Sequence, residues 1–199
     1  MEAIFTAKYE RGGWGGLGSG PGSTLEFNQF TYIPFLQKFL TDYSIRSVVD
    51  VGCGDFQCGS AIYSKFTDIS YCGIDCCQKV IEKNKKLYSP FQFLHSDVSV
   101  YPEQIPSADL CILKDVLQHW DTETIVKFLD FLVSSQKFHY ILLINCCNQT
   151  EDYSNIQIGD CRPLSSQCFP LKQYNPKSLY LYSTKEVCLL TCTTLVKLN

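Results

Sequence analysis

The sequence predicts a Rossmann-like α/β domain: a doubly wound sheet, mostly parallel, with an antiparallel strand from a C-terminal hairpin and helices on both faces. Three observations predict it. Short apolar runs alternate with amphipathic segments from residue 45 onward, a Gly-x-Gly turn follows the first run, and two apolar runs lie close together near the end. A length of 199 residues suits one domain with one core, so we expect a single domain over residues 1–199.

Five apolar runs are the expected parallel strands. They are Ser47–Val51, Ile69–Ile74, Phe91–Leu94, Ala108–Leu113 and Tyr140–Cys146. The segments between them have helical periodicity and are Gln57–Phe66, Gln78–Tyr88 and Thr122–Gln136, the last with Asp121 as its N-cap. Two closing runs, Ser178–Tyr182 and Val187–Leu198, are separated by a short connection, which predicts an antiparallel hairpin.

The first 24 residues are rich in glycine and predict a lid or loop. Seven of the twelve glycines fall between Gly12 and Gly22, and Trp14 lies among them, which favours a loop that folds over a ligand. A helix is expected over residues 25–43, because Ser23-x-x-Glu26 has capping-box spacing, with Pro34 as a point where it would kink. The remaining segments are a cofactor-binding core (45–147), a substrate loop (148–176) and the hairpin (177–199).

Composition excludes several classes of protein. A net charge of −3 and a pI near 5.6 lack the positive field of a nucleic-acid binder. No apolar run reaches the roughly 20 residues of a membrane span, and the first residues lack a secretory signal, so we expect a cytoplasmic protein, in its own or a host cell. The twelve cysteines contain no Cys-x-x-Cys pair, which favours buried thiols over zinc ligands or a disulfide framework.

Polar residues follow the expected strands where a doubly wound sheet binds its ligand. Gly52-Cys53-Gly54 lets backbone N–H groups approach a ligand, and Asp75, 21 residues after Gly54, suits the two hydroxyls of a ribose. Asp97, past the third strand, suits the exocyclic amine of an adenine. Gln57 stands where a dinucleotide site has its third glycine, which argues against NAD.

These motifs resemble those of the class I S-adenosylmethionine-dependent methyltransferases over residues 45–147. The resemblance implies that Asp50 and Gly52 hold the methionine part of the cofactor, Asp75 its ribose, and Asp97 with Val98 its adenine. S-adenosylhomocysteine would be the product. The complete set expected to bind the cofactor is Ser19, Gly20, Asp50, Gly52, Cys53, Gly54, Asp75, Cys76, Asp97, Val98 and Lys114.

Three flanking segments are similar to a narrower group, the small methyltransferases of bacterial and viral glycan clusters, including those of large algal viruses. They are Trp14 with Gly18–Ser23, Asp115–Trp120, and Gly159–Leu164. This resemblance implies an O-methyltransferase that acts on a sugar hydroxyl of a glycan, with a rhamnose-type deoxyhexose as one candidate. Ser165 stands where relatives often carry an aspartate, so that carboxylate has no counterpart here.

A sugar hydroxyl needs a general base, and His119 is the first candidate because histidine titrates near neutral pH. Asp115 could orient His119, act as the base itself, or help to hold a divalent metal ion, which is the less favoured role. The residues expected to contact the acceptor are Trp14, Trp120, Asn145 and Arg162. Two alternatives stay open: an acceptor amine or hydroxyl on a small metabolite or protein, and a non-catalytic module that binds the cofactor and acts through a partner.

Overall fold

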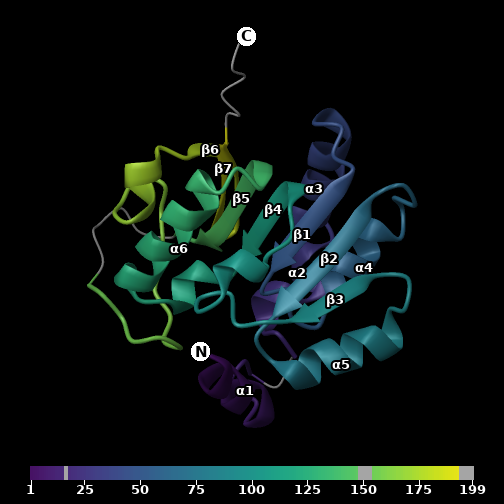
Figure 1. The fold of residues 1–199 in the computed structure, drawn as a ribbon, viewed down its shortest axis with the longest axis horizontal. Coiled ribbons are helices and arrows are strands. Elements are labelled where there is room, and N and C mark those ends of the chain that lie inside the picture. Colours follow the sequence, from purple (N-terminus) through teal and green to yellow (C-terminus); the bar gives the residue numbers. More distant parts are fainter. Residues whose placement is uncertain (16–17, 148–153, 193–199) are drawn as a thin grey trace.

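The computed structural model describes residues 1–15, 18–147 and 154–192, and these form a seven-stranded sheet. The strands are β1 (Ser47–Val51), β2 (Ser70–Asp75), β3 (Gln92–His95), β4 (Ala108–Lys114), β5 (Phe138–Cys146), β6 (Lys177–Tyr182) and β7 (Lys185–Thr191). Their order is β3-β2-β1-β4-β5-β7-β6 (Figure 1). The first five strands pair in parallel, whereas β7 runs antiparallel to β5 and β6. The predicted fold class is therefore confirmed.

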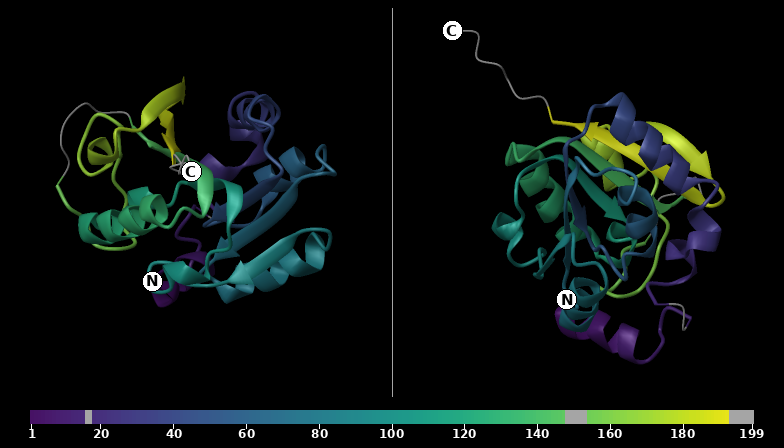
Figure 2. Two further views of the ribbon diagram at one scale, coloured as in Figure 1. Left: turned by 45° about the horizontal axis from the view of Figure 1, so that its top comes forward. Right: turned by 90° about the vertical axis from the view of Figure 1, so that its right-hand side faces the viewer.

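Helices cover both faces of the sheet, as Figure 2 shows from two further directions. The helices are α1 (Glu2–Glu10), α2 (Leu25–Asn28), α3 (Tyr32–Asp42), α4 (Gln57–Tyr63), α5 (Gln78–Leu87) and α6 (Thr122–Ser134), with short 3-10 turns at Pro21–Ser23, Pro102–Gln104, Leu117–His119 and Leu171–Tyr174. Apolar side chains of α3 and α4 pack on one face, and those of α6 pack on the other. Asp121 caps α6 as predicted, because its carboxylate accepts the Thr124 N–H at 2.8 Å.

Alternation along the strands builds these two core layers. Val48 faces the α3 layer and Val49 faces the α6 layer, and both are 1% exposed. Cys111 in β4 and Cys188 in β7 are buried free thiols within the α6 layer, as their apolar surroundings predicted. None of the helices in the described part of the chain is long and apolar enough to cross a membrane.

The single helix predicted over residues 25–43 is wrong, because α2 ends at Asn28 and α3 begins at Tyr32. Thr24, not Ser23, caps α2, since its hydroxyl accepts the Phe27 N–H at 3.3 Å. Phe30, in the break between the helices, is 83% exposed. A proline is tolerated in the first turn of a helix, where its missing N–H is not needed, and Pro34 lies there in α3.

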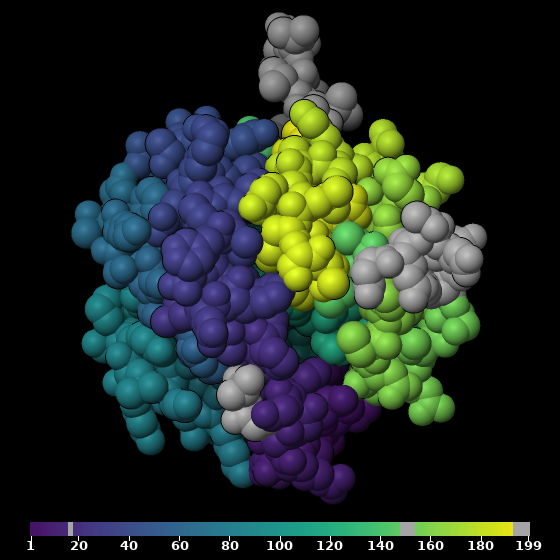
Figure 3. Space-filling view, turned by 180° about the vertical axis from the view of Figure 1, so that it is seen from behind, coloured from purple at the N-terminus to yellow at the C-terminus, as the bar shows by residue number. Residues whose placement is uncertain are grey.

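The N-terminal residues were predicted as a loop, but they begin with a helix. α1 is built from EAIFTAKYE, in which alanine, glutamate and lysine favour a helix. The glycine-rich turns follow it, up to Gly20, and we name residues 1–15 and 18–24 together the N-terminal lid. The space-filling view shows the lid in purple at one edge of the molecule, beside the light-green segment that follows residue 154 (Figure 3).

The hairpin begins one residue earlier than expected, at Lys177, and its connection is shorter than expected. β7 begins at Lys185, two residues before the predicted strand, and the predicted continuation to Leu198 lies outside the described residues from 193 onward. The predicted substrate loop is likewise described only from Ser154, because residues 148–153 lie outside the described part. Because β7 is reversed, its first residues lie beside the carboxyl end of β5: Lys185 pairs with Cys146.

Candidate active site

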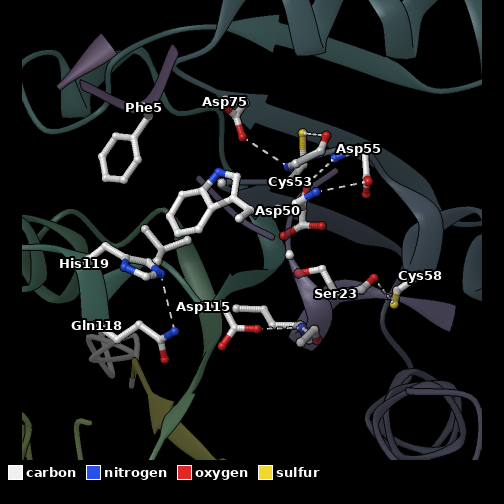
Figure 4. A pocket seen from close by; sticks show the side chains of 18 of the residues that line it. Phe5, Ser23, Asp50, Cys53, Asp55, Cys58, Asp75, Asp115, Gln118 and His119 are labelled. Atoms are coloured by element: carbon white, nitrogen blue, oxygen red, sulfur yellow. Dashed lines mark hydrogen bonds and ion pairs between the residues drawn. The ribbon is translucent and has the colours of Figure 1, made fainter. Parts of the chain in front are cut away.

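A cavity of about 790 Å³ opens at the carboxyl ends of β1, β2, β4 and β5, under the N-terminal lid. Its volume lies in the range of roughly 300–1,000 Å³ that is typical of ligand pockets. Figure 4 shows two groups of side chains around it. Asp50, Asp55 and Asp75 gather near the turn that follows β1, and Gln118, His119 and Asp115 lie on the other side.

The turn after β1 requires glycine at two positions. Gly52 has a φ of 72° and Gly54 a φ of 54°, a backbone region that favours glycine. A Cβ at Gly52 would lie 2.4 Å from the Val116 side chain, and one at Gly54 would lie 2.3 Å from the Ser19 hydroxyl. The turn therefore presents bare backbone to the pocket, with no room for side chains.

Asp75, the last residue of β2, is held by this turn. Its carboxylate accepts the N–H of Gly54 at 3.1 Å and that of Cys77 at 2.9 Å. Burial raises the pKa of Asp75, the two N–H groups oppose that rise, and the net pKa is above the ordinary value. Asp75 thus joins the glycine turn to the end of β2 at the wall of the pocket.

Asp50 lies in β1 at the floor of the pocket and accepts a hydrogen bond from the Tyr71 hydroxyl at 2.9 Å. Burial raises the pKa of Asp50 to about 7, against the opposing effects of Tyr71 and the Lys114 ammonium. A carboxyl group with such a pKa lacks a strong cationic partner and would be stabilised as the anion by one.

The N-terminal lid lies directly on the glycine turn. The Ser19 hydroxyl accepts the Asp55 N–H at 2.8 Å, the Ser19 N–H donates to the Asp55 carboxylate at 3.2 Å, and the Tyr9 hydroxyl lies 3.0 Å from that of Ser19. The ring of Trp14 meets the ring of His119 edge-on, with 4.9 Å between centroids. The lid therefore covers both groups of side chains that Figure 4 separates.

Asp97, past β3, also contacts the lid. Its carboxylate accepts hydrogen bonds from the Met1 ammonium at 2.6 Å and from the Glu2 N–H at 3.2 Å. Burial raises the pKa of Asp97, but the ammonium and other donors outweigh burial, and the pKa lies below its ordinary value. The neighbouring Val98 is buried and also lines the pocket.

His119 is fixed in one tautomer by two neighbours. Its Nδ1 lies 2.8 Å from the carbonyl oxygen of Asp160, and since a carbonyl only accepts, we assign the proton to Nδ1. The amide nitrogen of Gln118 lies 3.4 Å from Nε2, and the Cys146 N–H orients that amide by donating to its oxygen at 2.9 Å. Burial lowers the pKa of His119, so Nε2 carries a lone pair at neutral pH.

Asp115 follows β4 with a φ of 60° and lies between two ammonium groups. The Lys114 Nζ is 2.8 Å from one carboxylate oxygen, and the Lys185 Nζ contacts the other. Burial raises the pKa of Asp115, but the two lysines outweigh burial and hold the net pKa below its ordinary value. Asp115 is therefore an ion-paired anion rather than a proton acceptor.

Most of the predicted site residues line the pocket. All eleven that the resemblance assigned to the cofactor do so, as do His119, Asp115, Trp14 and Trp120. Trp120 is only 4% exposed and also packs against Phe128, with ring centroids 5.1 Å apart.

Two predicted acceptor contacts, Arg162 and Asn145, lie outside the lining of this pocket. The Arg162 guanidinium donates to Thr122 Oγ1 at 3.0 Å and to the Trp120 carbonyl at 3.4 Å, which ties its loop to the start of α6. Asn145 is 2% exposed within β5. Neither residue lines the pocket.

Several lining residues had no signal in the sequence. Lys185 was missed because the predicted strand began at Val187, and nothing in the sequence placed the start of a reversed strand at the pocket. Tyr9 and Phe5 were missed because they belong to a helix that the neighbouring glycines obscured in the sequence. Phe5 stacks on Trp14, with 6.3 Å between the ring centroids. Within the described ranges, no group of three or more His, Cys, Asp and Glu side chains is placed to hold a metal ion.

This sheet order, with a glycine turn after β1, a carboxylate at the end of β2 and another after β3, defines a class I S-adenosylmethionine-dependent methyltransferase. The model of one family, described as the O-methyltransferase domain, matches residues 30–158. The chain belongs to this O-methyltransferase domain family. No curated protein sequence matches it.

Solved structures share the fold at low sequence identity. The methyltransferase domain of bacterial CtHen1-CN has a TM-score of 0.61 at 14% identity, over 80% of this chain and 96% of that one. A putative O-methyltransferase from Nostoc punctiforme has a TM-score of 0.58 at 12% identity, over 79% and 54%. The mitomycin 7-O-methyltransferase MmcR has a TM-score of 0.56 at 15% identity, over 74% and 49%. The chain thus spans about half the length of the last two.

Proposed function

We propose that this protein transfers a methyl group from S-adenosylmethionine to an acceptor hydroxyl, with His119 as the general base. The hydrogen bonding of His119 carries the proposal. The Asp160 carbonyl keeps the proton on Nδ1, so Nε2 carries the lone pair. The Gln118 amide donates to that lone pair over a long 3.4 Å and would give way to the acceptor hydroxyl, whose proton Nε2 then accepts. Burial lowers the pKa of His119, which keeps the imidazole neutral at pH 7 and able to act as a base.

The pocket fits the cofactor at the glycine turn, where a Cβ on Gly52 or Gly54 would fill the space that bare backbone leaves. Asp50 and Gly52 would hold the methionine part, since a carboxyl with a pKa of about 7 suits an incoming ammonium. Asp75 would bind the ribose. The adenine would lie near Asp97 and Val98, and the rest of the cofactor set is Ser19, Gly20, Cys53, Gly54, Cys76 and Lys114. When bound, the cofactor supplies an electrophilic methyl group on a sulfonium.

His119 is the better candidate for the base than Asp115. The two lysines hold the pKa of Asp115 below its ordinary value, and a weaker base accepts a hydroxyl proton less readily. In this mechanism Gln118 is a positioning residue, because its amide contacts Nε2 and is itself fixed by the backbone of Cys146. His119 and Gln118 are both buried, which limits the access of water to the base.

We propose a sugar hydroxyl of a glycan as the acceptor, with a rhamnose-type deoxyhexose among the candidates. Trp14 supports this choice, because its ring stands edge-on to His119 at 4.9 Å and would offer an aromatic face beside the base. Trp120 would add to that surface. In this proposal residues 1–199 act as one domain, with residues 1–24 as the lid that folds over both ligands.

Two measurements test the proposal. Calorimetry should detect S-adenosylmethionine binding to the wild type and a large loss in Asp75→Ala. His119→Ala should lower kcat by about 10²- to 10⁴-fold and leave cofactor affinity within twofold, as expected for the loss of a general base. His139→Ala is the matched control, because His139 is 64% exposed in its side chain and does not line the pocket. Methylation of amines but not of sugar hydroxyls in a panel of acceptors would contradict the proposed acceptor class.

A further inference from the structure

Two buried ammonium groups share a single carboxylate in the pocket. The side chain of Lys185 is 4% exposed and that of Lys114 10%, and both pair with Asp115. Burying an ammonium is costly unless an anion compensates it. Two positive charges against one negative charge leave this cluster with a net charge of +1.

The two lysines differ in how fully they are bonded. Lys114 Nζ donates to the Gly22 carbonyl at 2.8 Å and to Asp115 at 2.8 Å, and lies 5.4 Å from the ring centroid of Tyr32. Lys185 Nζ contacts Asp115 and the thiol of Cys146, which is 3.4 Å away and a weak acceptor. Among the described residues, Lys185 therefore has one strong partner for an ammonium that can donate three hydrogen bonds.

Lys185 is connected to the proposed base through Cys146 and Gln118. Its Nζ contacts the Cys146 thiol, and the backbone N–H of Cys146 orients the Gln118 amide that touches His119. A group bound by Lys185 would thus share the pocket with the acceptor hydroxyl.

Charge is also divided along the pocket. Figure 4 shows Asp50, Asp55 and Asp75 at the glycine turn, where a cationic cofactor is proposed, and Asp115 on the other side of the pocket. Lys114 and Lys185 both pair with Asp115. Lys8 adds a further positive charge to the lining near Trp14, 4.9 Å from its ring. Such a pocket favours a cation at one end and an anion at the other.

We propose that the acceptor carries an anionic group, a carboxylate or a phosphoryl group, and that Lys185 binds it. This inference rests on the proposed function and narrows its acceptor from sugars in general to acidic sugars or sugar phosphates. Before the acceptor binds, Asp115 holds the two ammonium groups in place. When the acceptor binds, its anionic group adds a second negative charge, so that two positive charges meet two negative charges.

The test uses the full chain saturated with S-adenosylhomocysteine, titrated in a calorimeter with matched probes. Glucuronate and glucose 1-phosphate are the anionic probes, glucose is the neutral one and glucosamine the cationic one. Acetate and inorganic phosphate, with acetamide as their neutral counterpart, test the anion without a sugar. We expect the anions to bind about 10- to 150-fold more tightly than the neutral probes, since a charged hydrogen bond contributes about 1.5–3 kcal/mol. The two anion types identify which group is preferred.

Lys185→Met should abolish this preference, while Lys38→Met is a matched control at an exposed lysine paired with Asp42. The affinities of the wild type for anionic and neutral probes test the preference for an anion even if Lys185→Met does not fold. Equal affinity for anionic and neutral probes, or a preference that survives in folded Lys185→Met, would overturn the inference. Failure of the wild type to bind S-adenosylhomocysteine would instead overturn the proposed function, so the two failures are distinguishable.

Discussion

Asp50→Asn should make the free protein more stable and its cofactor affinity weaker. The folded-state pKa of Asp50 is about 7, against an ordinary value of 3.8. Because folding raises the pKa of Asp50, its contribution to the free energy of unfolding is most favourable below pH 3.8 and is lost as the pH rises toward 7. A rise of about three pKa units, at 1.36 kcal/mol each, means that the Asp50 carboxyl lowers the free energy of unfolding by about 4 kcal/mol at pH 8 and by about 2 kcal/mol at pH 5. Asparagine keeps an acceptor for the Tyr71 hydroxyl and removes the titration.

Urea unfolding of the wild type and Asp50→Asn, each without cofactor, checks this calculation. The stability gain of the variant should grow from about 2 kcal/mol at pH 5 to at most about 4 kcal/mol at pH 8, with no further rise above that pH. A gain that is independent of pH, or a variant that is less stable throughout, would refute the reasoning. The refutation would mean that Asp50 is ionised at neutral pH without the cofactor.

The same carboxyl sets the pH dependence of cofactor binding. Wild-type affinity for S-adenosylmethionine should fall by up to tenfold per unit as the pH drops below about 7, because the neutral acid cannot pair with an ammonium. Binding at pH 6 should release close to one proton, which calorimetry in buffers of different ionisation enthalpy measures. Asp50→Asn should bind weakly at every pH. A wild-type affinity that is flat between pH 6 and 8 would contradict this assignment.

Three further predictions concern single residues. The kcat of the wild type should fall as the pH drops through a pKa below 6.5, because burial lowers the pKa of His119, and it should be flat above neutrality; a fall that begins above pH 7 would point to another base. Gly54→Ala should abolish cofactor binding, because its Cβ would lie 2.3 Å from the Ser19 hydroxyl, whereas Gly15→Ala, also at positive φ but with open space, should bind normally. Arg162→Met should lower the free energy of unfolding by about 1–3 kcal/mol with KM unchanged, since it breaks buried hydrogen bonds outside the pocket; an increase in KM alone would return Arg162 to the acceptor site.

The parallel sheet was predictable because its signal is local. Each strand is a run of apolar residues bounded by polar turns, and Ser47–Val51 was predicted to the residue. The glycine turn, Asp75 and Asp97 follow from strand ends, which a doubly wound sheet brings to one edge. The order of the strands was therefore enough to predict that these residues line the pocket.

Other parts of the site depend on tertiary contacts that no local pattern encodes. Arg162 looked like an acceptor contact because arginine often binds polar ligands, but the Trp120 carbonyl and the Thr122 hydroxyl at the start of α6 set the direction of its side chain. The partners of Asp115 come from the adjacent residue and from Lys185, 70 positions away. Only the register of β7 against β5 reveals that pairing.

The N-terminal lid also has a kinetic consequence. α1 contributes no fully buried residue, yet Ser19 rests on the glycine turn and Trp14 rests on His119. Segments with so little buried surface open at low free-energy cost. Because one segment covers both halves of the pocket, the proposed function implies that cofactor exchange and acceptor entry would pass through the same opening, whose rate would set an upper limit on turnover.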